Sequence, residues 1–285
     1  MAGQLILVGT PIGNLGDFSP RALEAMEQCD FIAAEDTRVT MKLLNHFGIR
    51  KPLISYFEHN KREKGEVITA RIAAGETCVL VTDAGMPAIS DPGEDIVAKC
   101  HEMGIHVTSV PGPSAVVTAL AVSGMPSARF TFEGFLSVNK KSRRAHLMEI
   151  RDEKRTMVFY EAPHKLAATL RDLLEALGDR RIALVRELTK LHEEVIRTTL
   201  SQAAERFSPD GGETPRGEFV LVIDGAGDES PGEELSPEDA ARMARALMDG
   251  GLSRSEAAKQ AAKAARLKKG DVYRLLVGDD EGDAG

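Results

Sequence analysis

The stretch VTDAGMPAISDPG, residues 81–93, has the residue types of a loop that binds a ligand. An apolar run typical of a buried strand ends at Asp83, and the next ten residues hold two prolines, two glycines and a second aspartate. Glycine lets the backbone approach a ligand closely, and proline fixes the shape of a loop before the ligand arrives. Two further stretches, GTPIGNLG at 9–16 and PGPSA at 111–115, combine the same residue types after apolar runs. Each loop alone could be an ordinary strand-to-helix connection, but the three together predict one site built from backbone.

Short motifs of nucleotide and hydrolytic chemistry are absent from the sequence. It contains no GxxxxGK[ST] phosphate loop, no HExxH zinc helix and no GxSxG nucleophile elbow, which argues against kinases, zinc proteases and serine hydrolases. The glycines of the first turn, Gly9, Gly13 and Gly16, miss the GxGxxG spacing of dinucleotide sites. Pro11 in the same turn has no N–H to offer a phosphate. A dinucleotide site is therefore the weaker interpretation of this turn.

The composition is that of a globular protein, with 42% hydrophobic and 28% charged residues in a chain of 285. Lys and Arg number 36 and Asp and Glu 44, and the net charge of −8 argues against binding of nucleic acid by the whole surface. No apolar run approaches the roughly 20 residues of a membrane span, and the N-terminus lacks a signal-peptide pattern, so a cytoplasmic protein is expected. Three isolated cysteines predict buried, reduced thiols, and no metal site is expected.

Apolar runs alternate with amphipathic stretches over the first 122 residues, which predicts an α/β domain. The runs lie at 5–9, 31–36, 53–57, 78–83 and 106–110. They are continuous rather than alternating in polarity, which favours a mostly parallel sheet covered on both faces. Open sheets of this class bind ligands at the carboxyl ends of their strands, which is where the three loops rich in glycine and proline lie.

A second alternating set follows a cluster of Gly, Pro and Ser at 121–128, where we place a domain boundary. The expected strands lie at 130–135, 156–162, 181–188, 193–200 and 218–224, with helices near 139–151 and 163–177. The adjacent strand pair indicates a mixed sheet. The predicted fold class is thus α/β, with one α/β domain at 1–122 and a second at 123–226.

Residues 227–285 have the pattern of a linker followed by a small helical appendix. The segment GAGDESPGEE, at 225–234, is Gly-rich and acidic, whereas Ser253 and Glu256 have the spacing of a capping box at a helix start. Residues 253–274 hold seven Lys or Arg against two acidic residues, a local balance of +5. This basic appendix favours contact with a polyanion, and the alternative is a solvated amphipathic helix.

Seven motifs resemble, in the same order, those of the tetrapyrrole methylases. They are VGTPIGNLGD, AAEDTR, VTDAGMPAISDPG, VPGPSA, FEGF, FYEAPHK and VRELTK, and the resemblance extends over about residues 4–224. More narrowly, the motifs are similar to those of bacterial methyltransferases that modify the ribose 2′-hydroxyl of a cytidine in 16S rRNA. Thr82, Met86 and Lys165 depart from the Ser, Thr and Arg expected at these positions. At position 86 Met replaces the expected Thr and has no hydroxyl, so its side chain is not expected to form that hydrogen bond with the ligand. Backbone contacts at this position do not depend on the side chain.

The resemblance implies a folded S-adenosylmethionine (SAM) in a cleft between the two α/β domains, and a homodimer. The residues that it assigns to SAM are Thr10, Pro11, Asp83, Ala84, Gly85, Met86, Ile89, Ser114, Ala115, Tyr160 and Leu188. The implied reaction is attack of a ribose oxygen on the methyl carbon, with S-adenosylhomocysteine (SAH) as the leaving group. In such a reaction the protein positions the reactants and helps to remove a proton from a weakly acidic alcohol.

Titratable residues at the ends of apolar runs are candidates for this proton transfer and for holding the RNA. We hypothesise that Asp36 or His59 assists proton removal and that Arg38 holds the RNA. The other expected RNA contacts are Glu35, Asn60, Glu161, His164, Arg186, Glu187, Lys190, Lys263, Lys268 and Lys269. For any one of these residues, the alternative is a surface ion pair or a solvated loop position.

Two other functions use some of the same features. A small-molecule methyltransferase of the tetrapyrrole type would share the cleft but would not need the basic appendix. A non-catalytic ribosome-binding protein would bind RNA without consuming SAM. The expected partner is 16S rRNA or the 30S subunit, and uptake of labelled methyl groups by each substrate separates the three functions.

Overall fold

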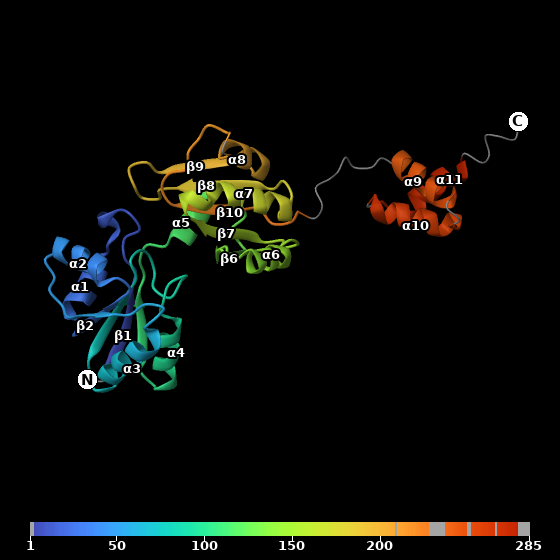
Figure 1. Ribbon diagram of the computed structural model, residues 1–285. Helices are drawn as coiled ribbons and strands as arrows, with labels where there is room; N and C mark the ends of the chain where they lie inside the picture. Colours follow the sequence, from blue (N-terminus) through green and yellow to red (C-terminus); the bar gives the residue numbers. More distant parts are fainter. Residues whose placement is uncertain (1–2, 209, 228–236, 250–251, 266, 279–285) are drawn as a thin grey trace, which may run out of the picture. The chain divides into compact units, whose positions relative to one another are not determined.

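Figure 1 shows the computed structural model, which describes residues 3–208, 210–227, 237–249, 252–265 and 267–278. The chain separates into two compact units, Met1–Ala226 and Gly227–Gly285. The first unit contains two five-stranded sheets with helices packed on them. Among the described residues, the second unit is entirely helical.

The first sheet is parallel and is built from the apolar runs of the N-terminal part of the chain. Its strands are β1 (Gln4–Val8), β2 (Phe31–Ala34), β3 (Leu53–Ser55), β4 (Thr77–Val81) and β5 (His106–Val110). Their order is β3-β2-β4-β1-β5, and all four neighbouring pairs are parallel. Every residue of β2 is buried, as expected for a strand covered on both faces. The predicted parallel α/β sheet is confirmed.

Helices cover both faces of this sheet. They are α1 (Pro20–Gln28), α2 (Thr37–His46), α3 (Lys61–Ala73) and α4 (Glu94–Glu102). One apolar cluster joins Met26 of α1 and Leu44 of α2 to the sheet, and a second joins Ile68 of α3 and Ile96 of α4 to the opposite face. The three cysteines are buried free thiols inside these clusters, as the sequence predicts.

The second sheet is mixed, also as predicted. Its strands are β6 (Phe130–Phe135), β7 (Thr156–Glu161), β8 (Arg181–Arg186), β9 (Glu194–Thr199) and β10 (Phe219–Ile223), in the order β6-β7-β10-β8-β9. Only the pair of β6 and β7 is parallel in this sheet. Helices α6 (Lys140–Glu149), α7 (Pro163–Leu177) and α8 (Leu200–Arg206) pack on one face through a leucine-rich cluster.

Helix α5 (Ala115–Ser123) follows the first sheet in sequence but packs on the second. Val116 and Leu120 share an apolar cluster with Val158 of β7 and Val185 of β8. Burial of this face fixes the second sheet against the end of the PGPSA loop, so α5 links the two sheets. The domain boundary that we predict between 122 and 123 falls at the end of this helix and stays a prediction.

The second unit is a small bundle of helices α9 (Pro237–Asp249), α10 (Arg254–Ala264) and α11 (Lys269–Gly278). Its core is made mainly of alanine, with Val272 and Leu276 from α11. At the start of α10 the Glu256 N–H donates to the Ser253 hydroxyl at 3.4 Å, as the Ser of the predicted capping box requires, and this hydroxyl donates to the Glu256 carboxylate at 2.9 Å. None of the helices in the described part of the chain is long and apolar enough to cross a membrane.

Candidate functional site

The two sheets of the first unit enclose a cavity of about 480 Å³. One side is formed by loops that follow strands of the first sheet, and the other by the ends of β6, β7, β8 and β10. The three loops singled out by glycine and proline all contribute, through Ile12, residues 82–86 and 89–91, and residues 114–115. The carboxyl ends of the first sheet thus form half of one ligand-sized cavity, as open α/β sheets commonly do.

The loop after β4 is tied to the loop after β1 by a short backbone bridge. The Thr10 N–H donates to the Gly85 carbonyl at 2.9 Å, and the Gly85 N–H donates to the Thr10 carbonyl at 3.0 Å. The Thr10 hydroxyl also donates to the Thr82 carbonyl at 3.1 Å. Gly85 has a φ of +90°, which glycine adopts without steric cost. The bridge holds the backbone of residues 84–86 along the cavity wall.

The turns after β1 and β5 touch each other through backbone alone. A Cβ atom on Gly9 would lie 2.8 Å from the Cα of Gly112 and 2.7 Å from the Sδ of Met86. A Cβ on Gly112 would lie equally close to Gly9, at 2.8 Å from its Cα. No side chain fits between these turns, and the Met86 side chain, which lines the cavity, rests against Gly9.

Backbone strain is concentrated in two of the loops beside the cavity. Ala88 and Ser90, in the loop after β4, have φ angles of +68° and +65°. Glu187 and Thr189, in the loop after β8, have φ angles of +51° and +64°. Residues other than glycine rarely adopt a backbone conformation with φ in this range, and each such residue costs of order 1–3 kcal/mol of folding free energy. Strained residues of this kind cluster at ligand-binding sites, where the shape of the loop matters more than its stability.

Glu35, Asp83 and Asp91 lie on one side of the cavity, where the pKa values of the two aspartates are raised. Burial, and then the charge of Glu35, raise the pKa of Asp91 to about 6. Burial also raises the pKa of Asp83, although the Asp36 N–H donates to Asp83 Oδ1 at 3.1 Å and partly offsets this effect. The Thr82 hydroxyl donates to Glu35 Oε2 at 2.6 Å. This acidic wall stabilises a cationic group more than a neutral or anionic one.

The opposite wall is aromatic and aliphatic. The Tyr160 ring lies 5.0 Å from that of Phe132 and 5.4 Å from that of Phe135, both in tilted or edge arrangements. Burial raises the pKa of Tyr160 to about 12, so its hydroxyl stays neutral. Val185 and Leu188 extend the apolar surface. The cavity therefore suits a ligand with an apolar or aromatic part and a cationic part.

Nine of the eleven residues that the resemblance assigns to the cofactor line this cavity. They are Asp83, Ala84, Gly85, Met86, Ile89, Ser114, Ala115, Tyr160 and Leu188. The other two, Thr10 and Pro11, do not line it. Thr10 is buried and bonded to the Gly85 backbone, so it supports the wall from behind.

None of the three residues assigned to catalysis lines the cavity. Asp36 caps helix α2 by accepting from the Arg38 N–H at 2.8 Å, and its carboxylate also pairs with the Arg38 guanidinium at 2.6 Å. These hydrogen bonds from Arg38 lower the pKa of Asp36 to about 2, which makes it a weak proton acceptor. The Arg38 side chain is 87% exposed. His59 lies in the turn before α3, with its ring 6.2 Å from that of Phe57.

Of the residues of the first unit that were assigned to RNA, Glu35 and Glu161 line the cavity, and Asn60, His164, Arg186, Glu187 and Lys190 do not. Glu161 is buried and accepts hydrogen bonds from the Ala162 N–H at 2.9 Å and from the Thr169 hydroxyl, so it fixes the start of α7. Asn60 closes its own turn, because its amide accepts from the Phe57 N–H at 2.8 Å. The Asn60 carboxamide and the Glu161 carboxylate thus form hydrogen bonds within the fold.

The loop after β8 carries an ion-pair network. Lys190 Nζ lies 2.9 Å from Glu187 and 3.0 Å from Glu218, and Arg186 lies 3.4 Å from Glu213. These pairs brace the strained backbone of the loop. His164 lies in the first turn of α7, directly after Pro163, which lines the cavity.

The basic residues assigned to RNA in the appendix belong to the second unit. Lys268 and Lys269 are exposed, and Lys269 Nζ contacts the Ser255 hydroxyl at 2.8 Å. The side chain of Lys263 lies outside the described residues.

Asp91 and Phe135 line the cavity, although no role was predicted for either from the sequence. Asp91 is the second aspartate of the loop at 81–93, and its place in a loop rich in glycine and proline was the available signal. Phe135 ends the FEGF motif and is 56% exposed at the cavity, in a chain with only 5% aromatic residues. Neither position could be assigned to the wall without the pairing of segments distant in sequence.

Comparison with known proteins places the first unit in a described family. Residues 4–204 match the family model "Tetrapyrrole (Corrin/Porphyrin) Methylases". Two solved structures share the fold: uroporphyrin-III-C-methyltransferase from Thermus thermophilus, with a TM-score of 0.55 at 18% identity, and a diphthine synthase, with 0.57 at 15%. They cover 79% and 78% of this chain, and 94% and 90% of the other chains. The predicted fold class is confirmed.

Curated relatives are much more similar in sequence. A protein named ribosomal RNA small subunit methyltransferase I from Synechocystis sp. is 47% identical over 96% of this chain and 98% of its own length. A protein of the same name from Escherichia coli O157:H7 is 42% identical over 96% and 95%. A third, from Thermotoga maritima, is 48% identical over 78% of this chain and 99% of its own length. The chain belongs to the tetrapyrrole methylases and, within them, to the family of ribosomal RNA small subunit methyltransferase I.

Proposed function

We propose that the protein transfers the methyl group of SAM to the ribose 2′-hydroxyl of a cytidine in 16S rRNA. Family membership supports the reaction class, since relatives at 42% to 47% identity over nearly the whole chain are named as ribosomal RNA methyltransferases. The observation that carries the proposal is the cavity, whose acidic wall faces an aromatic and aliphatic one.

The residues of the cavity fit SAM. SAM has a positive sulfonium, an ammonium and a single carboxylate, so it is a net cation attached to an aromatic base and a ribose. The carboxylates Asp83 and Asp91 on the cavity wall compensate positive charge, and the Tyr160 ring on the opposite wall offers an aromatic surface for the base of SAM. The volume of about 480 Å³ lies within the usual range for a ligand of this size. When bound, SAM supplies an electrophilic methyl carbon.

The loops of the first sheet would bind and orient this cofactor mainly through backbone. The bridge between Thr10 and Gly85 fixes the wall, and the close contact of Gly9 with Gly112 fixes the spacing of the two adjacent turns. A site held in shape before binding loses less conformational entropy when the ligand arrives. This preorganisation is the main contribution that the chain makes to a displacement in which the cofactor carries the reactive group.

A ribose hydroxyl that attacks a methyl carbon must also give up a proton. Of the described carboxylates that line the cavity, Asp91 has a pKa raised to about 6, so it is ionised near pH 7 yet more basic than an ordinary aspartate. Asp36 has a pKa of about 2 and is held by Arg38, which makes it the weaker acceptor. We therefore assign proton acceptance to Asp91, with His59 as the alternative, and keep Arg38 as an RNA contact.

The proposed partner is 16S rRNA within the 30S subunit, in the cytoplasm. A homodimer is also proposed, and it is supported by large apolar side chains on the outer face of α5, where Val117 is 60% and Val122 44% exposed. The basic appendix adds phosphate contacts through residues such as Lys268 and Lys269 in this proposal. In this proposal the appendix plays an auxiliary part. The match with the relative from Thermotoga maritima covers 99% of that protein in 223 residues, which is close to the length of the first unit alone.

The decisive experiment incubates the full chain with methyl-labelled SAM and one of three acceptors: unmethylated 30S subunits, naked 16S rRNA, or a precorrin. Label in a cytidine ribose of 16S rRNA is the expected result. Label in the precorrin would establish the tetrapyrrole-type alternative. RNA binding without label in any acceptor would indicate a non-catalytic ribosome-binding protein.

A further inference from the structure

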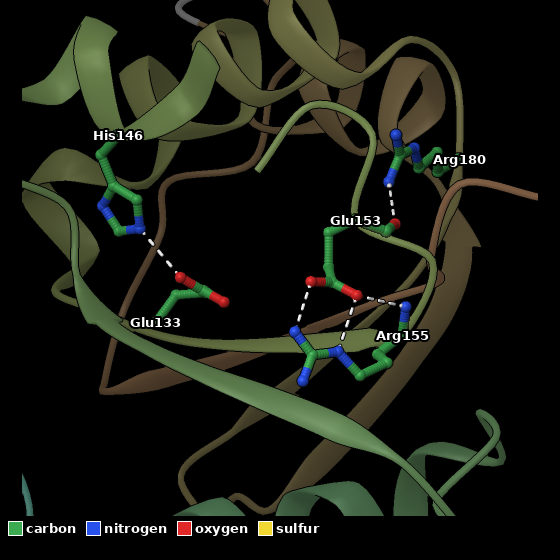
Figure 2. A network of polar contacts seen from close by, with 5 residues as sticks. All are labelled: Glu133, His146, Glu153, Arg155 and Arg180. Carbon is green, nitrogen blue, oxygen red and sulfur yellow. Dashed lines mark hydrogen bonds and ion pairs between the residues drawn. The ribbon is translucent and has the colours of Figure 1, made fainter. Parts of the chain in front are cut away.

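Helix α6 has two faces of different character. Its inner face is fixed to the second sheet and to α7: the His146 ring lies 2.9 Å from the Glu133 carboxylate of β6, Arg143 donates to the Thr169 hydroxyl at 2.9 Å, and Leu147 is buried. Figure 2 shows His146 pointing down from α6 to Glu133. These inner positions recur three or four residues apart, as one face of a helix requires.

The turn that follows α6 is also fixed. The Arg155 guanidinium pairs with the Glu153 carboxylate at 2.6 Å, and the Arg180 guanidinium donates to the Glu153 carbonyl at 3.4 Å (Figure 2). At its other end Asn139 caps the helix, and its side chain accepts from the Lys141 N–H at 3.0 Å. Both ends and the inner face of α6 are thus held by the fold without its remaining cations.

The outer face of α6 carries those cations. Lys140, Lys141 and Arg144 are all exposed, and none of the ion pairs or hydrogen bonds within the described residues involves their side chains. No acidic residue occurs in α6 before Glu149, its last residue. Because α6 does not need these charges for its own packing, they form a positive surface available to a partner.

Along the chain, this positive surface follows closely after a residue that lines the cavity. Phe135 ends β6, lines the cavity and is 56% exposed, and only four residues separate it from Lys140. Leu136, the next residue, is buried and fixes the start of this short connection. The Phe135 ring is supported from below by Tyr160 at 5.4 Å, so it is held in place while one side stays open.

An exposed aromatic ring beside unpaired cations is the combination with which proteins bind single-stranded nucleic acid. Bases stack on the ring, and the cations hold the phosphates. We propose that Phe135 and the outer face of α6 (Lys140, Lys141 and Arg144) bind the single-stranded RNA segment that carries the target nucleotide, with a base stacked on Phe135. The proposal rests on the proposed function and locates RNA recognition within the first unit rather than in the appendix alone.

Charge complementarity favours RNA over a protein or a small molecule as the occupant. The cavity wall is acidic and repels a phosphate, whereas the face of α6 outside it is basic. A polyanion is therefore held at the mouth, and only an uncharged part, such as a ribose with its base, can enter. The relative from Thermotoga maritima, which is about as long as the first unit, also favours an RNA surface within that unit.

The test measures binding of a single-stranded RNA of about twelve nucleotides containing cytidine, with the full chain saturated with SAM. Phe135→Leu keeps an apolar side chain at the cavity but removes the ring, and we expect about a tenfold loss of RNA affinity. Phe135→Tyr restores the ring and should restore affinity. Equal affinities for the Leu and Tyr variants would overturn the stacking role.

The cationic face is tested with the triple variant Lys140→Gln, Lys141→Gln and Arg144→Gln. For single strands each phosphate contact contributes about 0.7 to the slope of log K against log salt, so the triple variant should lower the slope by about 2. The matched control, Arg21→Gln, Arg50→Gln and Arg62→Gln, removes the same charge from exposed sites elsewhere and should leave the slope unchanged. Equal slopes for the two triple variants would overturn the proposal.

Two further readouts separate this inference from the proposed function. If the wild-type protein methylates 30S subunits and the α6 variant does so with an unchanged KM, the inference fails and the proposed function stands. If the wild-type protein labels no RNA, the proposed function fails first. A variant that weakens binding to 30S subunits but not to naked RNA would show that a ribosomal protein occupies this face, which also overturns the inference. SAM affinity of the triple variant, expected to match the wild type, verifies folding.

Discussion

The cavity wall and the outer face of α6 carry opposite charges, although Phe135 connects them within a few residues. The cavity is lined by Glu35, Asp83 and Asp91 and, among the described residues, by no Lys or Arg. Burial and the charge of Glu35 raise the pKa values of Asp83 and Asp91. On α6, the exposed Lys140 and Arg144 have no acidic partner among the described residues. The difference indicates how one site can take two ligands of opposite charge, since each surface repels the ligand that the other attracts.

The largest expected effect comes from removing the charge of Asp91. Asp91→Asn is nearly the same size but cannot accept a proton, and general-base catalysis typically contributes about 10²–10⁴-fold. We expect kcat for methylation of 30S subunits to fall at least about 100-fold, measured by label transfer. Asp17→Asn, an exposed control, should leave it unchanged. A kcat for Asp91→Asn within a few fold of wild type would move the proton acceptor elsewhere, with His59→Ala as the next variant to measure.

A side chain between the two turns behind the cavity should deform the acidic wall while leaving α6 intact. In Gly112→Val the new Cβ would meet the Gly9 backbone at 2.8 Å, so the turns must separate. Overpacking of this kind costs about 1–3 kcal/mol, and we expect that loss in the free energy of unfolding together with weaker SAM binding. Chemical denaturation measures the free energy of unfolding, and titration calorimetry measures the affinity for SAM. Gly270→Val, at another glycine without a positive φ and where a Cβ meets nothing within 4 Å, is the matched control and should leave SAM binding unchanged.

The pH dependence of cofactor binding should differ between SAM and SAH. Above pH 6 Asp91 is ionised, and as the pH falls through its pKa of about 6 the wall loses one negative charge. If SAM lowers the pKa of Asp91 by about one unit, the affinity for SAM falls about fivefold between pH 7 and pH 5, and the full factor of about ten is reached only well below pH 5. SAH, which lacks the sulfonium charge, should respond less. Titration calorimetry at both pH values compares them, and parallel curves would show that the acidic wall does not sense the cofactor's charge.

Two adjacent arginines of α6 allow effects on stability to be separated from effects on RNA binding. Arg143 is nearly buried and bonds Asp172 and Thr169, whereas Arg144 is exposed. Arg143→Gln should cost about 1–2 kcal/mol of stability because the buried Thr169 hydroxyl and the partly exposed Asp172 carboxylate lose their donor. Arg144→Gln should change stability by less than about 0.5 kcal/mol and weaken only RNA binding. Thermal unfolding and RNA titration of both variants check this division, and equal stability loss would show that both arginines serve the fold.

The smallest effect is expected from removing the appendix. A chain ending at Ala226 keeps the whole cavity and α6, because both lie in the first compact unit. We expect a KM for 30S subunits raised by only a few fold, a slightly smaller salt dependence and an unchanged kcat. A loss of activity above about 100-fold would make the appendix the principal RNA-binding element and weaken the role given to α6.

The elements and the loops of the cavity could be predicted from the sequence, because continuous apolar runs and clusters of Gly and Pro are local signals. The sheet on which α5 packs could not be predicted, because its apolar face could cover either sheet. Contacts with residues distant in sequence, such as Val158 and Val185, place it on the second sheet. The raised pKa of Asp91 depends on burial and on Glu35, which follows β2 and comes near Asp91 only because β2 and β4 are neighbours in the sheet. Asp36 looked equally suitable for catalysis until its pairing with Arg38 was visible.

The contact between Gly9 and Gly112 limits how such a site can diverge. Side chains on the walls can be exchanged one at a time, because each exchange leaves the two turns in place. A contact made only of backbone offers nothing to exchange except the glycines themselves, and any larger residue forces the turns apart. Sequence drift is therefore directed to the walls, where ligand preference is set, while the frame persists.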